Sequence, residues 1–502
     1  MNAVVIGAGL GGLSAAAHLA KAGMNVTVLE HHSVPGGYAH EFKRGEFRFE
    51  VALHALDGVG QGGWLHPILE ELGINIAMTR LDPLYGVRYP DLDIAVPADL
   101  AEYRALLAEL FPLEREGVRD LIENLRQVSH DVGRYTVDRH GGSRPTPGEM
   151  LERYPAMAGA FSRPWSELLT DYIHDSRLAT IFSALWGYLG LPPSSVSAGL
   201  FALAWNSYHV GGGYYPPGGS QALSRAFEHV VNSHGGKVLY RQTVNGITVR
   251  NGKAVAVTTE RGLTVDADVV ISNASPSDTI RFLGDDVLPS DYVVRLRNDV
   301  PSLSTLVVYL GLGMDLGAEG WDHHEVFVAD TYDTDADYRA ALSGDFEHTS
   351  MVVADYTHVD PGCAPPGKSA LVMLTLAPWG YEDTWGTDGN LGGYRRNPQY
   401  RALKDRAAEV LLSRAERLIP GIRGSIEVME VATPLTNHRY GLAPQGSIYG
   451  REQTVQNLLV RTSPKTPIPN VLLTGSWVSG GGMSTAIGSG KTTAGIVLSR
   501  ID

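Results

Sequence analysis

The segment AVVIGAGLGG, residues 3–12, decides the fold that we expect of this chain. Its apolar start predicts a short buried strand, and the Ala- and Leu-rich sequence that follows as far as Gly23 predicts a helix. A second apolar run, Asn25 to Leu29, ends at the acidic residue Glu30. Strand, glycine-rich turn, helix, strand and terminal carboxylate have the order and spacing of a dinucleotide-binding βαβ unit.

Each residue type in this unit has a physical reason. Gly7 permits the tight turn, Gly9 lets a pyrophosphate approach the backbone, and Gly12 lets the helix pack closely on the strand. The free N–H groups and the dipole at the helix start favour phosphate charge. Glu30 can accept hydrogen bonds from ribose hydroxyls. The alternative, a glycine-rich turn that holds no ligand, leaves the flanking strands and the acid at this offset unexplained.

Length and composition indicate a globular protein of two or three structural units, with 502 residues, 43% of them hydrophobic and 19% charged. The net charge of -14 argues against nucleic acid as a partner. Cys363 is the single cysteine, which excludes an intramolecular disulfide and a cysteine-based metal cluster and suits a reducing compartment. A strand that begins at residue 3 leaves no place for a usual signal peptide, and no apolar run reaches about 20 residues. We therefore expect a cytoplasmic protein, with peripheral membrane contact left open.

Changes in composition and periodicity along the sequence predict two interleaved domains in an α/β chain. A Rossmann-like nucleotide-binding domain is expected from residues 1–60, 210–300 and 465–502, and a mixed α+β substrate domain from residues 61–209 and 301–464. The first insertion is mostly helical by periodicity. In the middle piece, Asn251-Gly252 between two short apolar runs predicts a hairpin turn.

Several longer blocks then occur in a fixed order along nearly the whole chain. They include GAGLGGLSAAAHLAKAG (7–23), PGGYAHEF (35–42), ALWGYLGLPPSSVSA (184–198), ADVVISNASP (267–276) and TPLTNHRYGLAPQGSIYG (433–450). These blocks resemble the phytoene desaturase group of FAD-dependent oxidoreductases, which includes carotenoid cis–trans isomerases and retinol saturases. The resemblance implies an FAD-binding domain of the glutathione-reductase and amine-oxidase type, with FAD bound non-covalently.

The resemblance also assigns cofactor contacts, residue by residue. FAD would be held by glycines, one acid, one backbone position and two further side chains, namely Gly7, Gly9, Gly12, Glu30, Gly36, Gly37, Val244, Gly475, Ser476 and Met483. Three positions depart from the family's usual pattern. Tyr38 replaces an Arg, Ser476 replaces an Asp, and Glu50-Val51-Ala52 replaces Asp-x-Gly. A neutral Ser476 can still bond a ribityl hydroxyl, with a weaker contact than a charged group gives.

Candidate catalytic residues are fewer. The family places His54 and the block that holds Arg439 and Tyr449 near the flavin ring, while packing or ordinary hydrogen bonding remains the alternative for each. Four tryptophans could line an apolar tunnel or belong to the core, namely Trp186, Trp205, Trp379 and Trp477.

Two other patterns resemble binding motifs, but ordinary structural roles explain them better. The run GSGKTT, residues 488–493, lacks the first glycine of a phosphate loop, and we expect it to open the C-terminal helix. The pairs His31-His32 and His323-His324 have adjacent spacing, which does not put two ligands on one helical face. We therefore predict neither an ATP site nor a metal site.

Together these features predict an FAD-dependent oxidoreductase that modifies C–C or C=C bonds. The resemblance implies a long apolar polyene or isoprenoid as substrate, with desaturation, saturation or cis–trans isomerisation as the reaction. A hydride transfer of this kind needs orientation and water exclusion more than acid–base side chains. Two alternatives stay open: an amine-oxidase-type flavoenzyme, and a non-catalytic prenyl-lipid carrier on the same fold. The sequence names no electron partner.

Overall fold

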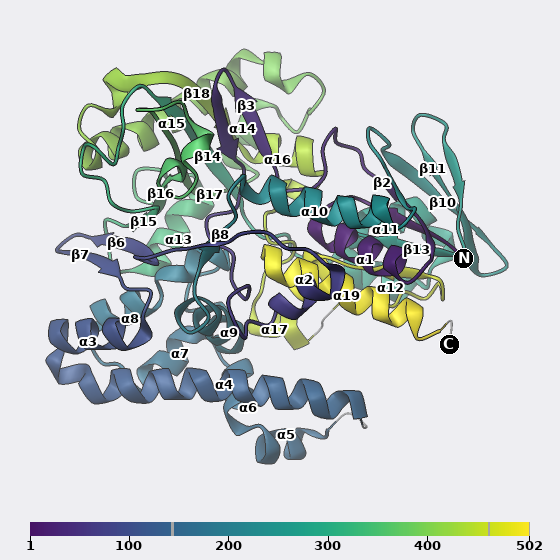
Figure 1. The fold of residues 1–502 in the computed structure, drawn as a ribbon, viewed down its shortest axis with the longest axis horizontal. Helices are drawn as coiled ribbons and strands as arrows, with labels where there is room; N and C mark the ends of the chain where they lie inside the picture. Colours follow the sequence, from purple (N-terminus) through teal and green to yellow (C-terminus); the bar gives the residue numbers. More distant parts are fainter. Residues whose placement is uncertain (142–144, 460–461, 501–502) are drawn as a thin grey trace.

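A five-stranded parallel sheet forms the right-hand part of the molecule in Figure 1, as seen in a computed structural model that describes residues 1–141, 145–459 and 462–500. The strand order is β19-β13-β1-β2-β9. The strands are β1 (Asn2–Ile6), β2 (Asn25–Leu29), β9 (Lys237–Leu239), β13 (Val269–Ser272) and β19 (Val471–Leu473). Three distant stretches of sequence thus build one sheet, and the predicted α/β class with a parallel sheet is confirmed.

Three helices cover one face of this sheet, and a small antiparallel sheet with two helices covers the other, so its inner strands are apolar throughout. Val4 and Val5 in β1 are both fully buried although they point to opposite faces. The covering helices include α1 (Leu10–Lys21), α10 (Gly219–Ser233) and α19 (Met483–Leu498). The α19 helix packs along α1, and the hydroxyl of Ser14 donates a hydrogen bond of 2.8 Å to the carbonyl of Ile487.

A small antiparallel sheet and two helices flank the parallel sheet. Its strands are β10 (Val244–Arg250), β11 (Lys253–Thr259) and β12 (Thr264–Asp266), and the helices are α11 (Pro276–Leu283) and α12 (Ser290–Arg297). Asn251 and Gly252, between β10 and β11, have φ of 51° and 73°. Positive φ at both central residues is the geometry of a type I′ turn, so the predicted hairpin is confirmed.

A second large sheet has seven strands in the order β18-β14-β17-β16-β15-β6-β7. They are β6 (Tyr85–Tyr89), β7 (Leu92–Val96), β14 (Ser304–Leu312), β15 (Glu325–Val328), β16 (Met351–Asp355), β17 (Ser369–Ala377) and β18 (Ile426–Ala432). The helices α13 (Thr334–Ser343), α14 (Tyr381–Gly386), α15 (Pro398–Leu418) and α16 (Pro434–Gly441) pack around it.

The strands β6 and β7, at one end of this sheet, were not expected in a segment whose periodicity is mostly helical. β6 pairs in parallel with β15, with Val87 opposite Phe327. Tyr85, Val87 and Tyr89 alternate with Gly86 and Arg88, a strand pattern that the helical interpretation of the whole segment overlooked. The β15 partner of β6 lies far away in the sequence, so local pattern could not reveal the pair.

A helical layer closes the lower side of the molecule in Figure 1. It contains α3 (Leu100–Leu110), α4 (Arg115–Gly141), α5 (Pro147–Arg153), α6 (Pro155–Phe161), α7 (Trp165–Thr170), α8 (Ser176–Phe182) and α9 (Ala198–His209). The Asn206 amide donates to the carbonyl of Leu125 at 2.5 Å, which ties α9 to the long α4. Among all helices that the structure describes, none combines the length and the apolar character needed to cross a membrane.

The remaining elements are short. They are the hairpin of β3 (Glu41–Arg44) and β4 (Phe47–Glu50), the pair β5 (Thr79–Arg80) and β8 (Tyr214–Tyr215), and the helices α2 (His66–Leu72), α17 (Val455–Leu459) and α18 (Ser476–Ser479). The β3–β4 hairpin carries the chain from the parallel sheet toward the seven-stranded one. His54 lies just beyond it, where segments of both sheets meet.

Candidate active site

Two glycine turns near the amino end, one at Gly7 and Gly9 and one at Gly36 and Gly37, form one cradle. Gly9 is the N-cap of α1 and supplies no side chain to cap it, so the first N–H groups of the helix stay available. The N–H of Gly36 donates to the carbonyl of Ala8 at 2.7 Å, which brings Gly36 and Gly37 beside this helix start. Gly36 has a φ of +122°, and a Cβ there would lie 1.9 Å from the carbonyl oxygen of Ala39. The cradle therefore requires glycine and suits a pyrophosphate.

Glu30 and Val244 lie on the same side of the cradle. The Glu30 carboxylate is buried and accepts hydrogen bonds from the N–H groups of Ala8, at 2.6 Å, and His32, at 2.7 Å. A carboxylate has about four acceptor sites, so room remains for ribose hydroxyls. Val244 is buried at the start of β10 and lines the same cavity. Gly12 does not line it: a Cβ there would lie 2.1 Å from the Gly7 carbonyl oxygen, so its role is close helix–strand packing.

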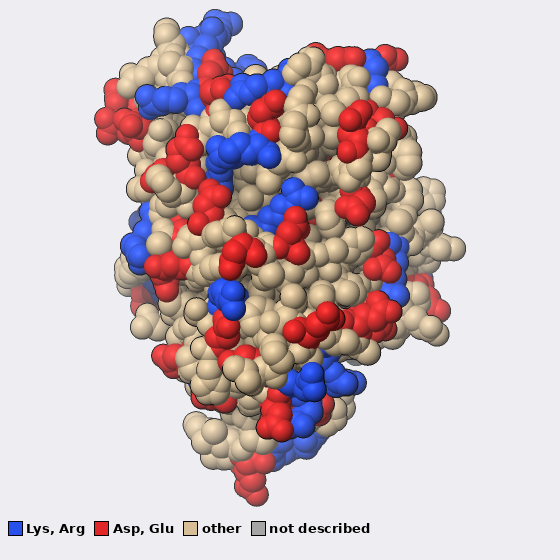
Figure 2. All heavy atoms as spheres, turned by 90° about the vertical axis from the view of Figure 1, so that its left-hand side faces the viewer, with Lys and Arg blue, Asp and Glu red and all other residues tan. Residues whose placement is uncertain are grey.

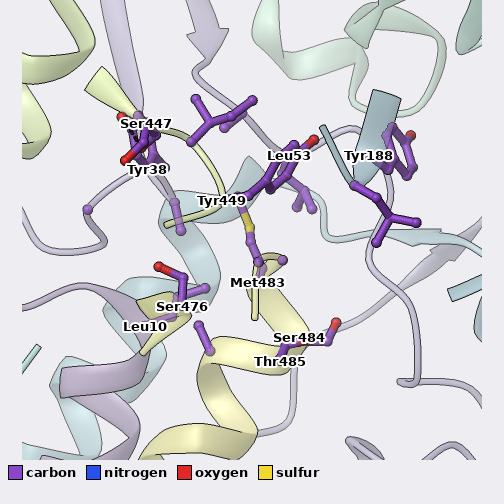
Figure 3. A pocket seen from close by; sticks show the side chains of 18 of the residues that line it. Leu10, Tyr38, Leu53, Tyr188, Ser447, Tyr449, Ser476, Met483, Ser484 and Thr485 are labelled. Atoms are coloured by element: carbon purple, nitrogen blue, oxygen red, sulfur yellow. Dashed lines mark hydrogen bonds between the residues drawn. The ribbon is translucent and has the colours of Figure 1, made fainter. Parts of the chain in front are cut away.

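The carboxyl-terminal residues meet the cradle from the other side. A Cβ on Gly11 would lie 2.8 Å from Cα of Gly475, so the two glycine turns are in contact. Ser476 and Met483 line the cavity, and both are labelled among the lining side chains in Figure 3. The N-cap of α19 is Gly482, again without a side-chain cap, so a second helix start faces the cavity. Except for Gly12 and Gly475, which do not line the cavity, the residues predicted to hold FAD are thus brought together around it.

Sequence reasoning missed Asn273, which sits between these turns. Its backbone N–H donates to the Ile6 carbonyl at 2.8 Å. Its amide Nδ2 lies 2.7 Å from the position that a Cβ on Gly9 would take, and its Oδ1 lies 2.3 Å from the corresponding position on Gly475. The signal was present, because Asn273 directly follows the apolar run of β13 in ADVVISNASP. Polar residues at the carboxyl ends of parallel strands commonly face the ligand.

The three departures from the family pattern have structural roles here. The hydroxyl of Tyr38 lies 3.1 Å from both the Gly446 and Ser447 carbonyl oxygens, so it anchors the cradle to a loop that follows α16. Glu50 accepts hydrogen bonds from the backbone of Leu53, at 3.1 Å, and from the N–H of Ser220, at 2.8 Å. This buried carboxylate ties the hairpin to the start of α10. Ser476, the third departure, faces the cavity.

Of the predicted catalytic residues, His54 lies on the cavity wall. Its side chain keeps 11% of its surface exposed, and Nδ1 lies 3.2 Å from the Tyr356 hydroxyl and 3.5 Å from Oε1 of Glu325. Burial lowers the pKa of His54 to about 3, so the imidazole is neutral at physiological pH. The structure thus surrounds His54 with groups that can exchange a proton with it.

Tyr449 and Arg439 have different surroundings. The ring of Tyr449 lines the cavity in Figure 3, and its hydroxyl donates to the Gly187 carbonyl at 3.0 Å. Arg439 is exposed and does not line the cavity; its guanidinium lies over the ring of Tyr440, 5.5 Å from the centroid. The structure therefore brings His54 and Tyr449 together and leaves Arg439 outside. A catalytic role for each stays a prediction, and for Arg439 it has no geometric support.

Beyond the cradle, the cavity extends between the seven-stranded sheet and the helical layer. It has a volume of about 1410 Å³. This part is lined by aromatic side chains, among them Tyr89, Trp186, Tyr188, Tyr208 and Phe327. Trp477 also lines the cavity, whereas Trp205 is fully buried in the core and Trp379 packs against His438. We call this aromatic half the substrate chamber.

The residues of the GSGKTT run and of the histidine pairs have the following surroundings. The GSGKTT run lies in the interior of α19, so the expectation that it opens the last helix is wrong: α19 begins at Met483, where the glycine loop ends. Lys491 pairs with Glu71 at 2.6 Å. His31 lies 2.8 Å from the Tyr440 carbonyl, and His324 lies 3.0 Å from that of Asp355. Within the described ranges, no group of three His, Cys, Asp or Glu side chains is placed to hold a metal ion.

A glycine cradle on a parallel sheet, an acid at the end of the second strand and a carboxyl-terminal helix that closes over them define a dinucleotide-binding oxidoreductase. The sequence pattern of flavin-containing amine oxidoreductases matches residues 10–380. The chain belongs to this family. It is an FAD-dependent oxidoreductase, and the uncapped helix start and glycine cradle described above fit the cofactor.

Individual relatives agree with this assignment. The chain is 27% identical to an all-trans-retinol 13,14-reductase from Danio rerio, over all of this chain and 86% of the relative. It is 28% identical to a phytoene dehydrogenase from Streptomyces griseus, over 98% of this chain and 94% of the relative. A solved oxidoreductase from Methanosarcina mazei has the same fold, with a TM-score of 0.66, 20% identity and coverage of 98% of this chain and 99% of that one.

Proposed function

We propose that this protein uses FAD to change C=C bonds in a long apolar polyene or isoprenoid of retinoid or carotenoid type. The observation that carries this proposal is the single cavity that runs from the glycine cradle into the aromatic substrate chamber. Its volume of about 1410 Å³ exceeds the roughly 300–1,000 Å³ typical of small-molecule pockets. The cavity therefore has room for a flavin end and a second, apolar molecule.

The chain's own part in the reaction is binding, orientation and exclusion of water. Bound FAD supplies the chemistry, which is the transfer of a hydride and its two electrons. Gly9 and the start of α1 would hold the pyrophosphate, and Glu30 would hold the ribose. The start of α19, near Met483, would face the flavin ring. The rings of Tyr188 and Tyr449 would keep the substrate's double bond in register with it.

Among the possible reactions, we favour saturation. The names of the two relatives above point in opposite directions, since one is a reductase and the other a dehydrogenase. Saturation needs a proton donor beside the substrate, and the neutral, cavity-facing His54 with the neighbouring Glu325 meets that need. Desaturation and cis–trans isomerisation remain the alternatives.

The face of the molecule drawn in Figure 2 gives no support for a nucleic-acid partner. Figure 2 shows the face that lies on the left of Figure 1, where Lys and Arg side chains are interspersed with Asp and Glu. Among the described residues drawn there, the basic side chains form no continuous stripe of the kind that nucleic-acid binding requires. An apolar small molecule is the partner that the substrate chamber favours.

The test uses the purified holoenzyme. Its flavin is reduced without oxygen and mixed with all-trans-retinol or with a carotenoid, and the flavin absorbance and the product mass are followed. Return of oxidised flavin, together with a product that has gained two hydrogen atoms, supports the proposal. Reduction of oxidised enzyme by an amine, with release of hydrogen peroxide, would favour the amine-oxidase alternative. A colourless protein that takes up no FAD would favour the carrier.

A further inference from the structure

Glu325 is a buried acid that the sequence did not mark as functional. It begins β15, and its side chain is 1% exposed. Oε2 accepts a hydrogen bond of 2.5 Å from the Tyr188 hydroxyl. Oε1 is buried and has no hydrogen-bond partner among the described residues. An ionised carboxylate with one bare oxygen in such surroundings is costly, so the neutral acid is favoured (about 1–3 kcal/mol or more for each unpaired group).

The imidazole of His54 lies beside this bare oxygen. Its Nδ1 lies 3.5 Å from Oε1, a separation that a small side-chain rotation brings into hydrogen-bond range. A protonated Oε1 therefore aims its hydrogen at Nδ1. No hydrogen bond of the described residues reaches Nε2 of His54, and this residue lines the cavity with 11% of its side chain exposed. The backbone of His54 is held by the His324 ring, whose Nε2 lies 2.8 Å from the His54 carbonyl.

The surroundings keep this pair neutral. Burial raises the pKa of Glu325 to about 8, while burial lowers that of His54. In the described part of the chain, neither Lys nor Arg forms an ion pair with Glu325. The titratable groups that face the pair are one imidazole and five phenols, namely His324, Tyr85, Tyr188, Tyr208, Tyr356 and Tyr449.

We propose that Glu325 is the proton source of the substrate chamber and that it acts through His54. As the Nε2–H bond of His54 breaks and its proton joins one carbon of the double bond, the O–H bond of Glu325 breaks and its proton joins Nδ1. The neighbouring carbon receives the hydride that reduced FAD supplies, so the substrate gains two electrons and two hydrogens. Glu325 is left as a carboxylate that Tyr188 stabilises, and His54 is left with its proton on Nδ1. A proton from solvent then joins Nε2 while the Nδ1 proton returns to Glu325, which restores both residues. This inference rests on the proposed saturation.

His54 is the catalytic residue in this scheme, because it touches the substrate, and Glu325 is a positioning and proton-supplying residue behind it. The concerted transfer never requires a charged imidazolium, which this buried site disfavours. It also explains why a polar pair is retained in an aromatic wall. Without a proton donor, hydride addition would leave an unstable carbanion in the chamber.

The test compares Glu325→Gln with Glu452→Gln. The amide introduced by Glu325→Gln would keep the volume and the contact with Tyr188 but cannot act as an acid. Glu452 is a second carboxyl whose pKa burial raises, and it does not line the cavity. In reduced holoenzyme mixed with a retinoid, we expect Glu325→Gln to slow flavin reoxidation roughly 100-fold or more. Glu452→Gln should match the wild type, and Glu325→Asp should recover part of the rate.

Two further readouts separate this role from a structural one. The wild-type rate should fall above about pH 8 as Glu325 loses its proton, and Glu325→Gln should lose that limb of the profile. Infrared difference spectra of the holoenzyme should show a protonated carboxylic acid that titrates in the same range and is absent from Glu325→Gln. Equal rates and pH profiles for wild type and Glu325→Gln would overturn the inference alone. Failure of the wild type to convert any polyene, with normal flavin content, would overturn the proposed function and this inference with it.

Discussion

The Ser14 hydroxyl in α1 donates a hydrogen bond of 2.8 Å to the Ile487 carbonyl in α19, across 473 positions of sequence. Close to this bond, a Cβ on Gly490 would lie 2.3 Å from the Gly11 carbonyl oxygen. The helix that begins the cofactor cradle therefore packs directly on the helix that closes it. Both ends of the described chain contribute to one site, and four predictions test this arrangement and its chemistry.

The first prediction concerns the contact between the two helices. Gly490→Ala should lower the free energy of unfolding by about 1–3 kcal/mol, because the added methyl meets backbone atoms of α1 that cannot move aside. Gly495 lies in the same helix with nothing within 4 Å of its Cβ position. Gly495→Ala should therefore leave stability unchanged or raise it by up to about 1 kcal/mol. Chemical denaturation of both variants measures the difference, and equal stabilities would contradict the packing described.

The second prediction concerns the cradle. Gly9→Val should yield protein that folds but carries little flavin, since the side chain would fill the approach to the start of α1 and collide with Asn273. A loss of about 1.4 kcal/mol in binding lowers affinity tenfold, and we expect at least that. Flavin absorbance per protein is the measurement. Gly159→Ala is a matched control, because its Cβ position has nothing within 4 Å. Normal flavin content in Gly9→Val would refute the assignment.

The third prediction separates Arg439 from Tyr449. Arg439→Ala should change flavin content and turnover by no more than about twofold, because exposed side chains away from a site contribute about 0.5 kcal/mol or less. Tyr449→Phe removes the hydrogen bond to Gly187, worth about 1 kcal/mol, and should loosen the aromatic wall and raise KM. Steady-state kinetics of the two variants decide the matter. A large loss of turnover in Arg439→Ala would restore the original expectation.

The fourth prediction concerns stability and pH. Burial raises the pKa of Glu325 in the folded protein to about 8, above its value of 4.5 in an unfolded chain. Between these values the folded state holds a proton that the unfolded state has lost, so the contribution of Glu325 to stability is present below about pH 4.5 and is lost as pH rises through about 8. Glu325→Gln removes this dependence. Its stability relative to wild type should therefore increase by a few kcal/mol between about pH 5 and about pH 8, and a flat difference would contradict the buried, neutral acid.

The structure bears out the local part of the sequence analysis well. The first βαβ unit and the Asn251-Gly252 turn depend on neighbouring residues, whose glycine and apolar spacing fix the backbone. The strands β6 and β7 form a local hairpin, and only the pairing of β6 with β15 depends on a partner far along the chain, which no local pattern encodes. The same distance hid Glu325, a single acid at the start of an apolar strand. Burial by other segments turned it from an ordinary charge into a neutral acid.

The direction in which a side chain points was the second feature that the sequence could not predict. Residues of one block can point to opposite sides of a helix, and this separates Arg439, which is exposed, from Asn437 and His438, which line the cavity. Asn273 was overlooked for the opposite reason: its type is common in turns, and only the folded sheet shows that it stands between two glycine turns. Residue type and spacing thus located the cradle, while the catalytic wall required three-dimensional contacts.

The parallel sheet also constrains how the protein is made. β13 pairs with β1 on one side and with β19 on the other, and β19 is followed at once by the segment that carries Ser476 and Met483. The pocket floor therefore does not exist until residues beyond 470 have left the ribosome. Flavin binding is consequently a late event in biogenesis. Until then, the apolar surface of the unfinished pocket is exposed and prone to aggregation.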